Sequence, residues 1–167
     1  FVPVVDPGAA SACHAAGVGA TLNLTIGHHL DPRWGTPVDI TGMVLRLTAG
    51  RFEYSGGIWE GKDGNMGPSA VFEIGNIQIL ITSLATYDWK DEQFRSVGIV
   101  PESAKFIVAK NPMNYRFAYG QIAKATYVLD TPGPTPSSIK HLEFKQLRRP
   151  FFPKDEDIPD AGMTLLV

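Results

Sequence analysis

Two short apolar segments joined by a glycine constrain the fold of this chain more than any other feature. Ser69–Ile74 and Ile77–Ser83 are rich in β-branched residues, which favour extended strands. Between them stands Gly75-Asn76, a pair suited to a tight turn between antiparallel strands. The pattern predicts a β-hairpin around which the core is assembled.

A second β region lies upstream. Val38–Leu47 and Arg51–Tyr54 are predicted strands, and Ala49-Gly50 between them predicts a tight turn and therefore another hairpin. Strands are also predicted at Val18–Ile26, where apolar and polar residues alternate, and at Thr126–Leu129.

Helices are predicted between these strands. Asp6 followed by Pro7 is typical of a helix start, so we expect a helix over Pro7–Ala16 that ends at Gly17. A second short helix is expected over Asp88–Val97. Helices interspersed with hairpins indicate an α+β fold, with a mixed, largely antiparallel β-sheet and a few packed helices, rather than a doubly wound parallel sheet.

The segment Lys105–Ala123 is the clearest candidate for a binding edge. Lys105–Ala109 has the profile of a strand buried on both faces, Asn111-Pro112 breaks the backbone, and a helical pattern continues to about Ala123. Loops that follow a strand and precede a helix often bind ligands. The polar side chains at this junction are Lys110, Asn111, Asn114 and Arg116. The alternative is that Lys110 and Arg116 are solvated surface charges.

Size and charge exclude several classes of protein. The 167 residues suffice for one domain, and a net charge of −2 does not favour nucleic acid or an anionic membrane as a partner. No apolar stretch approaches the roughly 20 residues needed to span a bilayer, so we expect a soluble, cytoplasmic protein. The single cysteine, Cys13, is expected to be a buried helical thiol. Because the first residue is Phe1 rather than Met, a fragment, a processed product and a domain taken from a longer protein are all open alternatives.

No self-contained catalytic motif is evident. The glycine-rich loop Ser55–Pro68 lacks the Lys-Ser/Thr ending of a phosphate-binding loop, and His14 has no acidic residue at the spacing of a helical zinc motif. His28, His29 and Asp31 could in principle bind zinc. Adjacent histidines on extended chain point to opposite sides, however, so this site is the least favoured alternative.

Several segments, taken in order, resemble the C-terminal domain of the microcystinase C (MlrC-like) metallopeptidase family. They are DPGAASACHAAGVGATLNLTIG (residues 6–27), DPRWGTPVDITGMVLRLTAGRF (31–52), MGPSAVFEIGNIQILITS (66–83), FRSVGIVPE (94–102), the stretch with Lys110, Arg116 and Ala118, and LRRPFFP (147–153). On this basis the domain is expected to span residues 1–155, with a C-terminal tail over residues 156–167.

The resemblance implies a two-domain, zinc-dependent hydrolase of peptides or small amides, such as linearised microcystin. An N-terminal domain of the same protein would supply the Asp and His zinc ligands, so no metal site and no catalytic residue are expected in this chain, which alone would be inactive. A supporting domain can hold the substrate and its developing charge. We therefore expect substrate binding by Lys110 as a point charge, Asn114 as a neutral donor and Arg116 as a bidentate partner of a carboxylate.

Two departures from the family pattern bear on this expectation. Asn114 stands where the family has a histidine, and Leu84 and Ala85 stand where arginines are expected. The alternative to an accessory hydrolase domain is a non-catalytic binding or assembly domain.

Overall fold

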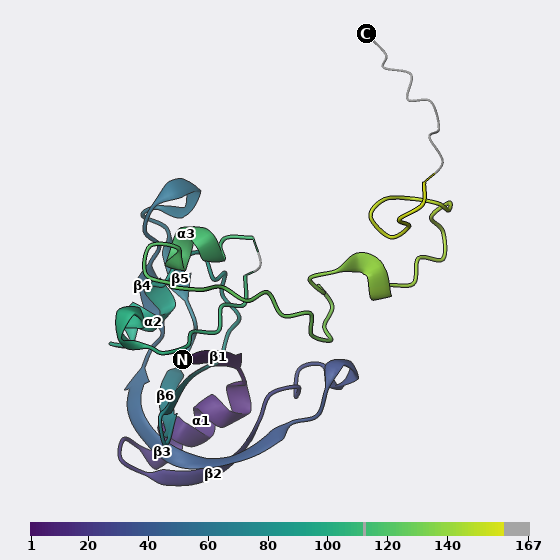
Figure 1. Cartoon of the computed structure of the whole chain (residues 1–167). Coiled ribbons are helices and arrows are strands. Elements are labelled where there is room, and N and C mark those ends of the chain that lie inside the picture. The colour runs from purple at the N-terminus through teal and green to yellow at the C-terminus, as the bar shows by residue number, and fades with distance from the viewer. Residues whose placement is uncertain (112, 159–167) are drawn as a thin grey trace. The chain divides into compact units, whose positions relative to one another are not determined.

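The computed structural model describes residues 1–111 and 113–158. They form two compact units, residues 1–126 and the residues from 127 onward, and the first unit carries the sheet and the packed helices (Figure 1). The predicted boundary between a domain over residues 1–155 and a tail stays a prediction. Residues 159–167 of that tail, and Pro112 of the predicted chain break, lie outside the described residues.

A five-stranded sheet forms the centre of the first unit. Its strands are β1 (Val2–Val5), β2 (Thr21–Ile26), β3 (Val38–Thr48), β6 (Ser69–Ile74) and β7 (Ile77–Thr82). Their order is β1-β7-β6-β3-β2, in which only β1 and β7 run parallel to each other. The predicted α+β fold with a mixed, largely antiparallel sheet is confirmed.

The predicted hairpin of β6 and β7 is confirmed and lies at the middle of this sheet. Ile74 pairs with Ile77, and Gly75 adopts a φ of 56°, which a side chain would disfavour. Alternate residues of the two strands face two separate apolar clusters, with Phe72 on one side and the paired Val71 and Leu80 on the other. Both faces are buried, which explains the nearly continuous apolar sequence of these strands.

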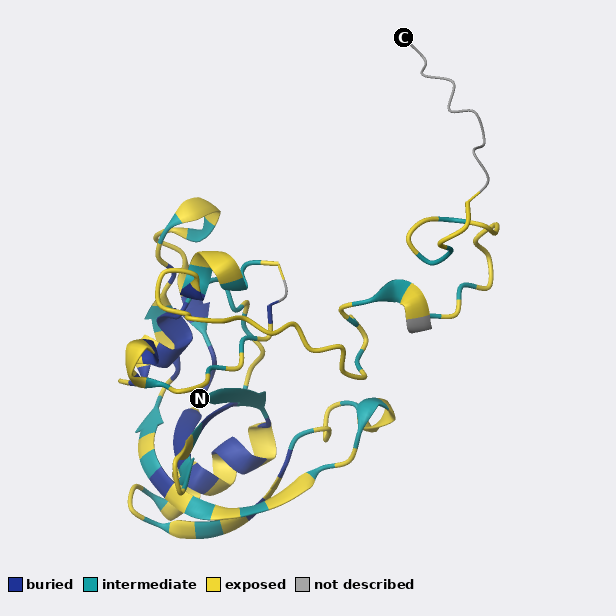
Figure 2. Cartoon of the chain, in the orientation of Figure 1, coloured by how far each residue is buried: buried dark blue, intermediate teal, exposed yellow. Residues whose placement is uncertain are grey.

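Helix α1 (Pro7–Ala16) covers one face of the sheet, as predicted. The Asp6 carboxylate accepts a hydrogen bond from the Ala9 amide (3.0 Å) and so caps the helix, and Gly17 ends it. Ala9, Ala10 and Cys13 are buried against the sheet, while the opposite side of the helix is exposed (Figure 2). The expectation of a buried thiol at Cys13 is confirmed.

A thinner layer covers the other face. It contains two single-turn helices, α2 (Glu92–Ser96) and α3 (Tyr115–Tyr119), together with irregular chain. Buried residues of this layer pack against Val71 and Leu80 of the sheet in a second apolar cluster, whose members are Met66, Val71, Leu80, Phe94, Val97, Ile99 and Tyr119. The described residues also contain the 3-10 turns η1 (Pro32–Trp34), η2 (Gly57–Trp59), η3 (Pro101–Ser103) and η4 (Ile139–His141).

The predicted hairpin at Ala49-Gly50 is wrong. The second strand, β4 (Arg51–Glu53), pairs with β5 (Asp63–Asn65) in a separate two-stranded sheet. The end of β3 instead pairs with the start of β6, and β4 is not among its partners. Gly50, with a φ of 72°, turns the chain out of the large sheet.

The predicted buried strand at Lys105–Ala109 is also wrong. The backbone nitrogen of Phe1 donates to the Phe106 carbonyl (2.7 Å), and the Val108 amide donates to the Phe1 carbonyl (2.9 Å). These two bonds place the segment beside the start of β1 without a ladder. Phe106 remains 69% exposed, because no layer among the described residues covers it.

Three further sequence predictions require correction. Thr126–Leu129 is exposed coil rather than a strand, with Tyr127 and Leu129 among the most exposed apolar residues. The predicted helices over Asp88–Val97 and Met113–Ala123 are reduced to α2 and α3. Polar side chains near the starts of these helices bind backbone groups elsewhere in the chain, which competes with helix formation.

The unit from residue 127 onward is held together by polar contacts around a small aromatic pair. The rings of Phe144 and Phe151 meet edge to face at 5.3 Å, and Arg149 forms an ion pair with Asp155. Lys140 pairs with Glu156 at 2.6 Å. Among the described residues of the whole chain, no helix is long and apolar enough to cross a membrane.

Candidate functional site

The parallel pair of strands creates the best-defined polar site in the first unit. Val5 and Thr82, the last residues of β1 and β7, are paired. The C-terminal ends of these two parallel strands therefore lie side by side. A small cavity of about 60 Å³ opens there. Its walls are Pro3, Val4 and Val5 of β1, Thr82 of β7, Thr86 and Asp88 of the following loop, Gln93 of α2, and Lys110.

Asp88 and Lys110 are the two ionisable groups of this cavity. The Lys110 amide donates to Oδ2 of Asp88 (3.0 Å), which holds the two residues together across 22 positions of sequence. Burial raises the pKa of the Asp88 carboxyl to about 6, and the hydrogen bond from the Lys110 amide only partly offsets this effect. Lys110 as a whole is exposed, but the surrounding protein partly withdraws its ammonium group from water and lowers its pKa, while the nearby Asp88 acts in the opposite direction.

Asn111 fixes the chain that carries Lys110. It is buried, its Nδ2 donates to the Asp88 carbonyl (2.6 Å), and its Oδ1 accepts from the amides of Met113 (3.0 Å) and Asn114 (3.1 Å). One side chain therefore ties the loop of Asp88 to the start of α3. The position of Lys110 beside Asp88 depends on this bridge.

The two other predicted site residues do not line the cavity. Asn114 precedes α3 and donates through Nδ2 to the Tyr87 hydroxyl (2.8 Å). Arg116 is exposed, its Nε donates to the Tyr115 hydroxyl (3.1 Å), and its guanidinium lies 5.6 Å from the centre of the same ring. The structure thus places Lys110 at the cavity. Asn114 is hydrogen-bonded to Tyr87, which precedes Asp88 in the loop, and Arg116 is exposed on α3.

A row of aromatic rings adjoins this region. Successive ring centres are 4.9 to 6.1 Å apart along Phe52, Tyr54, Trp59, Tyr87, Trp89 and Phe117. The row connects β4, η2, the loop before α2, and α3. Tyr87 and Phe117 are exposed, so part of the row faces solvent.

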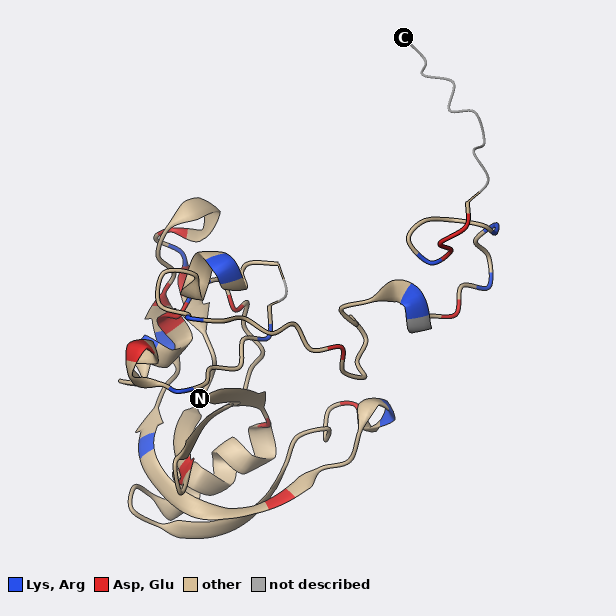
Figure 3. Cartoon of the chain, in the orientation of Figure 1, with Lys and Arg blue, Asp and Glu red and all other residues tan. Residues whose placement is uncertain are grey.

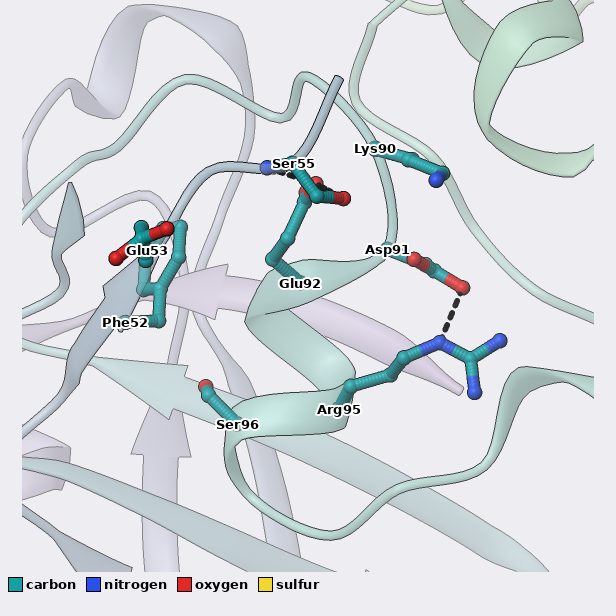
Figure 4. A pocket seen from close by; sticks show the side chains of 8 residues that line it. All are labelled: Phe52, Glu53, Ser55, Lys90, Asp91, Glu92, Arg95 and Ser96. Carbon is teal, nitrogen blue, oxygen red and sulfur yellow. Dashed lines mark hydrogen bonds and ion pairs between the residues drawn. The ribbon is translucent and has the colours of Figure 1, made fainter. Parts of the chain in front are cut away.

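A larger and shallower cavity of about 410 Å³ lies between β4 and α2 (Figure 4). Glu92 accepts hydrogen bonds there from the amide (2.9 Å) and hydroxyl (2.6 Å) of Ser55, and Arg95 pairs with Asp91 at 2.6 Å. Three of its charged groups, those of Asp91, Glu92 and Arg95, therefore already have partners within the protein. Basic and acidic residues are similarly intermixed over the rest of the first unit (Figure 3).

The loop with two histidines does not gather a metal site. His29 Nδ1 lies 2.8 Å from Oδ2 of Asp6, whereas both carboxylate oxygens of Asp31 bind Arg33 and Trp34. Burial alone would raise the pKa of Asp6, but hydrogen bonds from Ala9, His29 and Gly27 outweigh it and hold that pKa below its usual value. Within the described ranges no three or more His, Cys, Asp or Glu side chains are grouped so as to hold a metal ion.

Sequence reasoning missed Asp88, which it treated as the start of a helix. Its partner Lys110 is far away in the sequence, so no local pattern could reveal the pair. The turn made by Asn111 was accessible from sequence, because an Asn-Pro pair commonly accepts hydrogen bonds from amides two and three residues later.

The fold and this site define an α+β domain with a polar cavity at the ends of its parallel strands. The chain belongs to the family described as MlrC C-terminus, whose pattern matches residues 1–146. The resemblance inferred from the sequence is confirmed.

Two longer proteins are similar to this chain. Microcystinase C of Sphingomonas sp. is 22% identical over 151 residues, which cover 90% of this chain and 28% of that protein. The crystal structure of a candidate metallopeptidase from Mesorhizobium sp. BNC1 matches with a TM-score of 0.75 and 28% identity, over 92% of this chain and 31% of the other. The chain therefore spans less than a third of the length of either relative.

Proposed function

We propose that this chain is the accessory C-terminal domain of a metal-dependent hydrolase that acts on peptides or small amides. The supporting observations are its family and the likeness to a longer candidate metallopeptidase. An N-terminal domain of the same protein is proposed as its partner, since both relatives are more than three times as long as the matched part.

The metal of this hydrolase, proposed to be zinc, does not fit the described residues of this chain. The ionisable groups at the cavity are one carboxyl and one ammonium, and Asp6 and His29 form an isolated pair. A zinc site needs three or four suitable ligands. The ligands are therefore proposed to lie in the N-terminal domain, and no step through the metal is assigned to residues of this chain.

What this chain can supply is substrate binding. The single observation that carries this role is the cavity at the ends of β1 and β7, which combines a cationic side chain with an apolar wall. Lys110 is proposed to attract a negative group of the substrate, and Asn114 and Arg116 are proposed to bind other parts of the substrate outside the cavity. Arg116 is exposed and therefore accessible to a ligand, and a guanidinium group can bind a carboxylate through two parallel N–H donors.

The test is a kinetic comparison of variants in the longer protein. Lys110→Gln and Arg116→Ala should raise KM for a linear peptide substrate, or lower kcat/KM, without changing the melting temperature. Lys105→Gln removes the same charge from the same segment outside the cavity and serves as a control. Unchanged kinetics in both Lys110→Gln and Arg116→Ala would contradict the proposed role.

The aromatic row favours a second candidate function, a non-catalytic binding or assembly domain. Phe117 is 51% exposed at the end of the row, and Met113 and Ile58 are strongly exposed as well. Exposed apolar clusters often mark protein interaction surfaces. If Phe117→Ser weakens association with a partner while metal removal and Lys110→Gln leave all measured activity unchanged, this second function is favoured.

A further inference from the structure

The cavity beside Lys110 has the chemistry of a site for a small anion. Three side chains on its wall have hydrogen-bond donors to offer: the Lys110 ammonium group, the Thr86 hydroxyl and the Gln93 amide. Gln93 uses one N–H to bind the Tyr87 carbonyl (3.1 Å), which orients its amide group and leaves its second N–H available. The Thr82 hydroxyl, in contrast, already donates to the Leu84 carbonyl (3.1 Å).

The size of the cavity limits the ligand. Its volume of about 60 Å³ exceeds the roughly 10–15 Å³ that a cavity needs to admit one water molecule, so a group of a few heavy atoms can enter it. A carboxylate group fits such a space, with its carbon substituent directed along the apolar wall of Pro3, Val4 and Val5. An amide-hydrolase substrate commonly carries such a group at a peptide C-terminus or an acidic side chain.

Asp88 opposes such a ligand when it is ionised. It lines the same cavity as Lys110, and a second negative charge within a few ångströms would be repelled in this partly desolvated place. When Asp88 is protonated, the repulsion disappears and its O–H becomes another donor. Both effects strengthen anion binding in the protonated state.

The other ionisable groups that interact with Asp88 do not reverse this effect. Glu92 of α2 lies near enough to favour the protonated form of Asp88, and Lys110 favours the ionised form. Tyr54, beyond β4, and Tyr119 of α3 interact with Asp88, but burial raises the pKa of both phenols, so they stay neutral near pH 6. The charge of the cavity in this pH range therefore depends on Asp88.

We propose that this cavity is a carboxylate-binding subsite in which Lys110 supplies the positive charge and Asp88 makes binding stronger in mildly acidic than in neutral solution. The inference rests on the proposed function because it names the group of the substrate that Lys110 would hold. Asp88 is a specificity-determining residue in this scheme, since it weakens the binding of anions at neutral pH.

The binding test uses formate on the longer protein, because formate is small and stays ionised between pH 5.5 and 7.5. Binding is followed by NMR of isotope-labelled threonine methyl groups, for which Thr82 and Thr86 report directly on the cavity. Formate should bind about five- to tenfold more tightly at pH 5.5 than at pH 7.5, the size expected for removing one nearby charge. Formamide, a neutral molecule of the same shape, should bind weakly at both values.

Two variants with matched controls assign the effect to residues. Lys110→Gln should abolish formate binding at both pH values, and Asp88→Asn should make binding independent of pH. Lys105→Gln and Asp63→Asn carry the same charge changes outside the cavity and should behave like the parent protein.

Several results would overturn the proposal. In the parent protein, equal binding of formate and formamide would do so. In the variants, the contradicting results are retained formate binding in Lys110→Gln and an unchanged pH dependence in Asp88→Asn. A loss of formate binding in Lys105→Gln as large as in Lys110→Gln would also contradict it. The outcome is separable from the proposed function: formate binding that requires Lys110, together with peptide kinetics that do not, would leave the subsite standing and refute its role in hydrolysis.

Discussion

The five-stranded sheet and the irregular segment over residues 83–123 satisfy their backbone hydrogen bonds in different ways. In the sheet, amides and carbonyls bind one another along the paired strands. In the segment, side chains accept hydrogen bonds from several backbone amides. Asp88 accepts from the Lys110 amide, and Asn111 accepts from two amides before α3. The sheet is therefore stabilised by many equivalent contacts, whereas the geometry of the cavity depends on a few individual residues.

This difference indicates that the residues that stabilise the fold and the residues that shape the cavity lie in different parts of the domain. The central strands β6 and β7 are buried on both faces and are sensitive to loss of volume, and of their residues Thr82 lines the cavity. The loop residues that define the cavity chemistry are partly exposed and can change with less effect on the whole fold. Four substitutions test this comparison.

Phe72→Ala should have the largest effect. Phe72 is fully buried in the middle of β6, so its truncation leaves a cavity that the paired strands cannot close. We expect a loss of about 3–5 kcal/mol in the free energy of unfolding, measured by urea denaturation. Val18→Ala, at a 65% exposed position, is the control and should change stability by less than about 0.5 kcal/mol. A loss below about 1 kcal/mol for Phe72→Ala would show that the sheet does not carry the stability of the domain.

Asp88→Asn should alter the pH dependence of stability. Because the pKa of Asp88 rises from 3.8 to about 6 on folding, the folded state holds this proton more tightly, and stability is lost as the pH increases from about 4 to above 6. The asparagine variant lacks this loss. Relative to the parent protein it should gain up to about 2–3 kcal/mol between pH 4 and pH 7.5 in urea denaturation. Parallel pH profiles of the two proteins would mean that Asp88 titrates as an exposed carboxyl.

Asn111→Ala should loosen the cavity without unfolding the sheet. The substitution leaves the amides of Met113 and Asn114 without their acceptor and frees the Asp88 loop, at a local cost of about 1–2 kcal/mol. Hydrogen exchange should become faster at residues 113 and 114, while the amides of β6 and β7 stay protected. Faster exchange throughout β6 and β7 would show that the segment and the sheet unfold together. Asn65→Ala, which removes one amide acceptor outside this segment, is the matched comparison.

Arg116→Ala should have the smallest effect on stability. Arg116 is exposed and its hydrogen bond goes to the neighbouring Tyr115, so we expect a change below about 0.5 kcal/mol in the free energy of unfolding. A loss of more than about 1 kcal/mol in the free energy of unfolding would indicate that Arg116 stabilises the packing of α3 and is not available to bind a ligand.

The elements that could be predicted from sequence share one property, which is that local residues decide them. The β6–β7 hairpin follows from alternating burial and a turn glycine, and α1 follows from the Asp6 cap and Gly17. The predicted hairpin of β3 and β4 was wrong because the local sequence did not distinguish β4 from β6 as the partner of β3. In the structure the end of β3 pairs with β6 and β4 pairs with β5, and both partners lie further along the chain.

Only some residues of the candidate site could be predicted from local sequence patterns. Lys110 was predicted from its place after an apolar run, although that run is not a buried strand. Asp88 was missed, and Asn114 and Arg116 were grouped with Lys110 although neither lines the cavity. Proximity in sequence therefore identified the correct segment without identifying which of its side chains meet.

By itself, the amino-acid sequence determined the class of fold, the central hairpin, the capped first helix and the resemblance to a family, because each depends on short-range patterns of burial and backbone conformation. Only the tertiary structure decided which strands are neighbours and which carboxyl lies beside Lys110. These outcomes depend on contacts between residues far apart in the chain, and the burial that raises the pKa of Asp88 exists only after those contacts have formed.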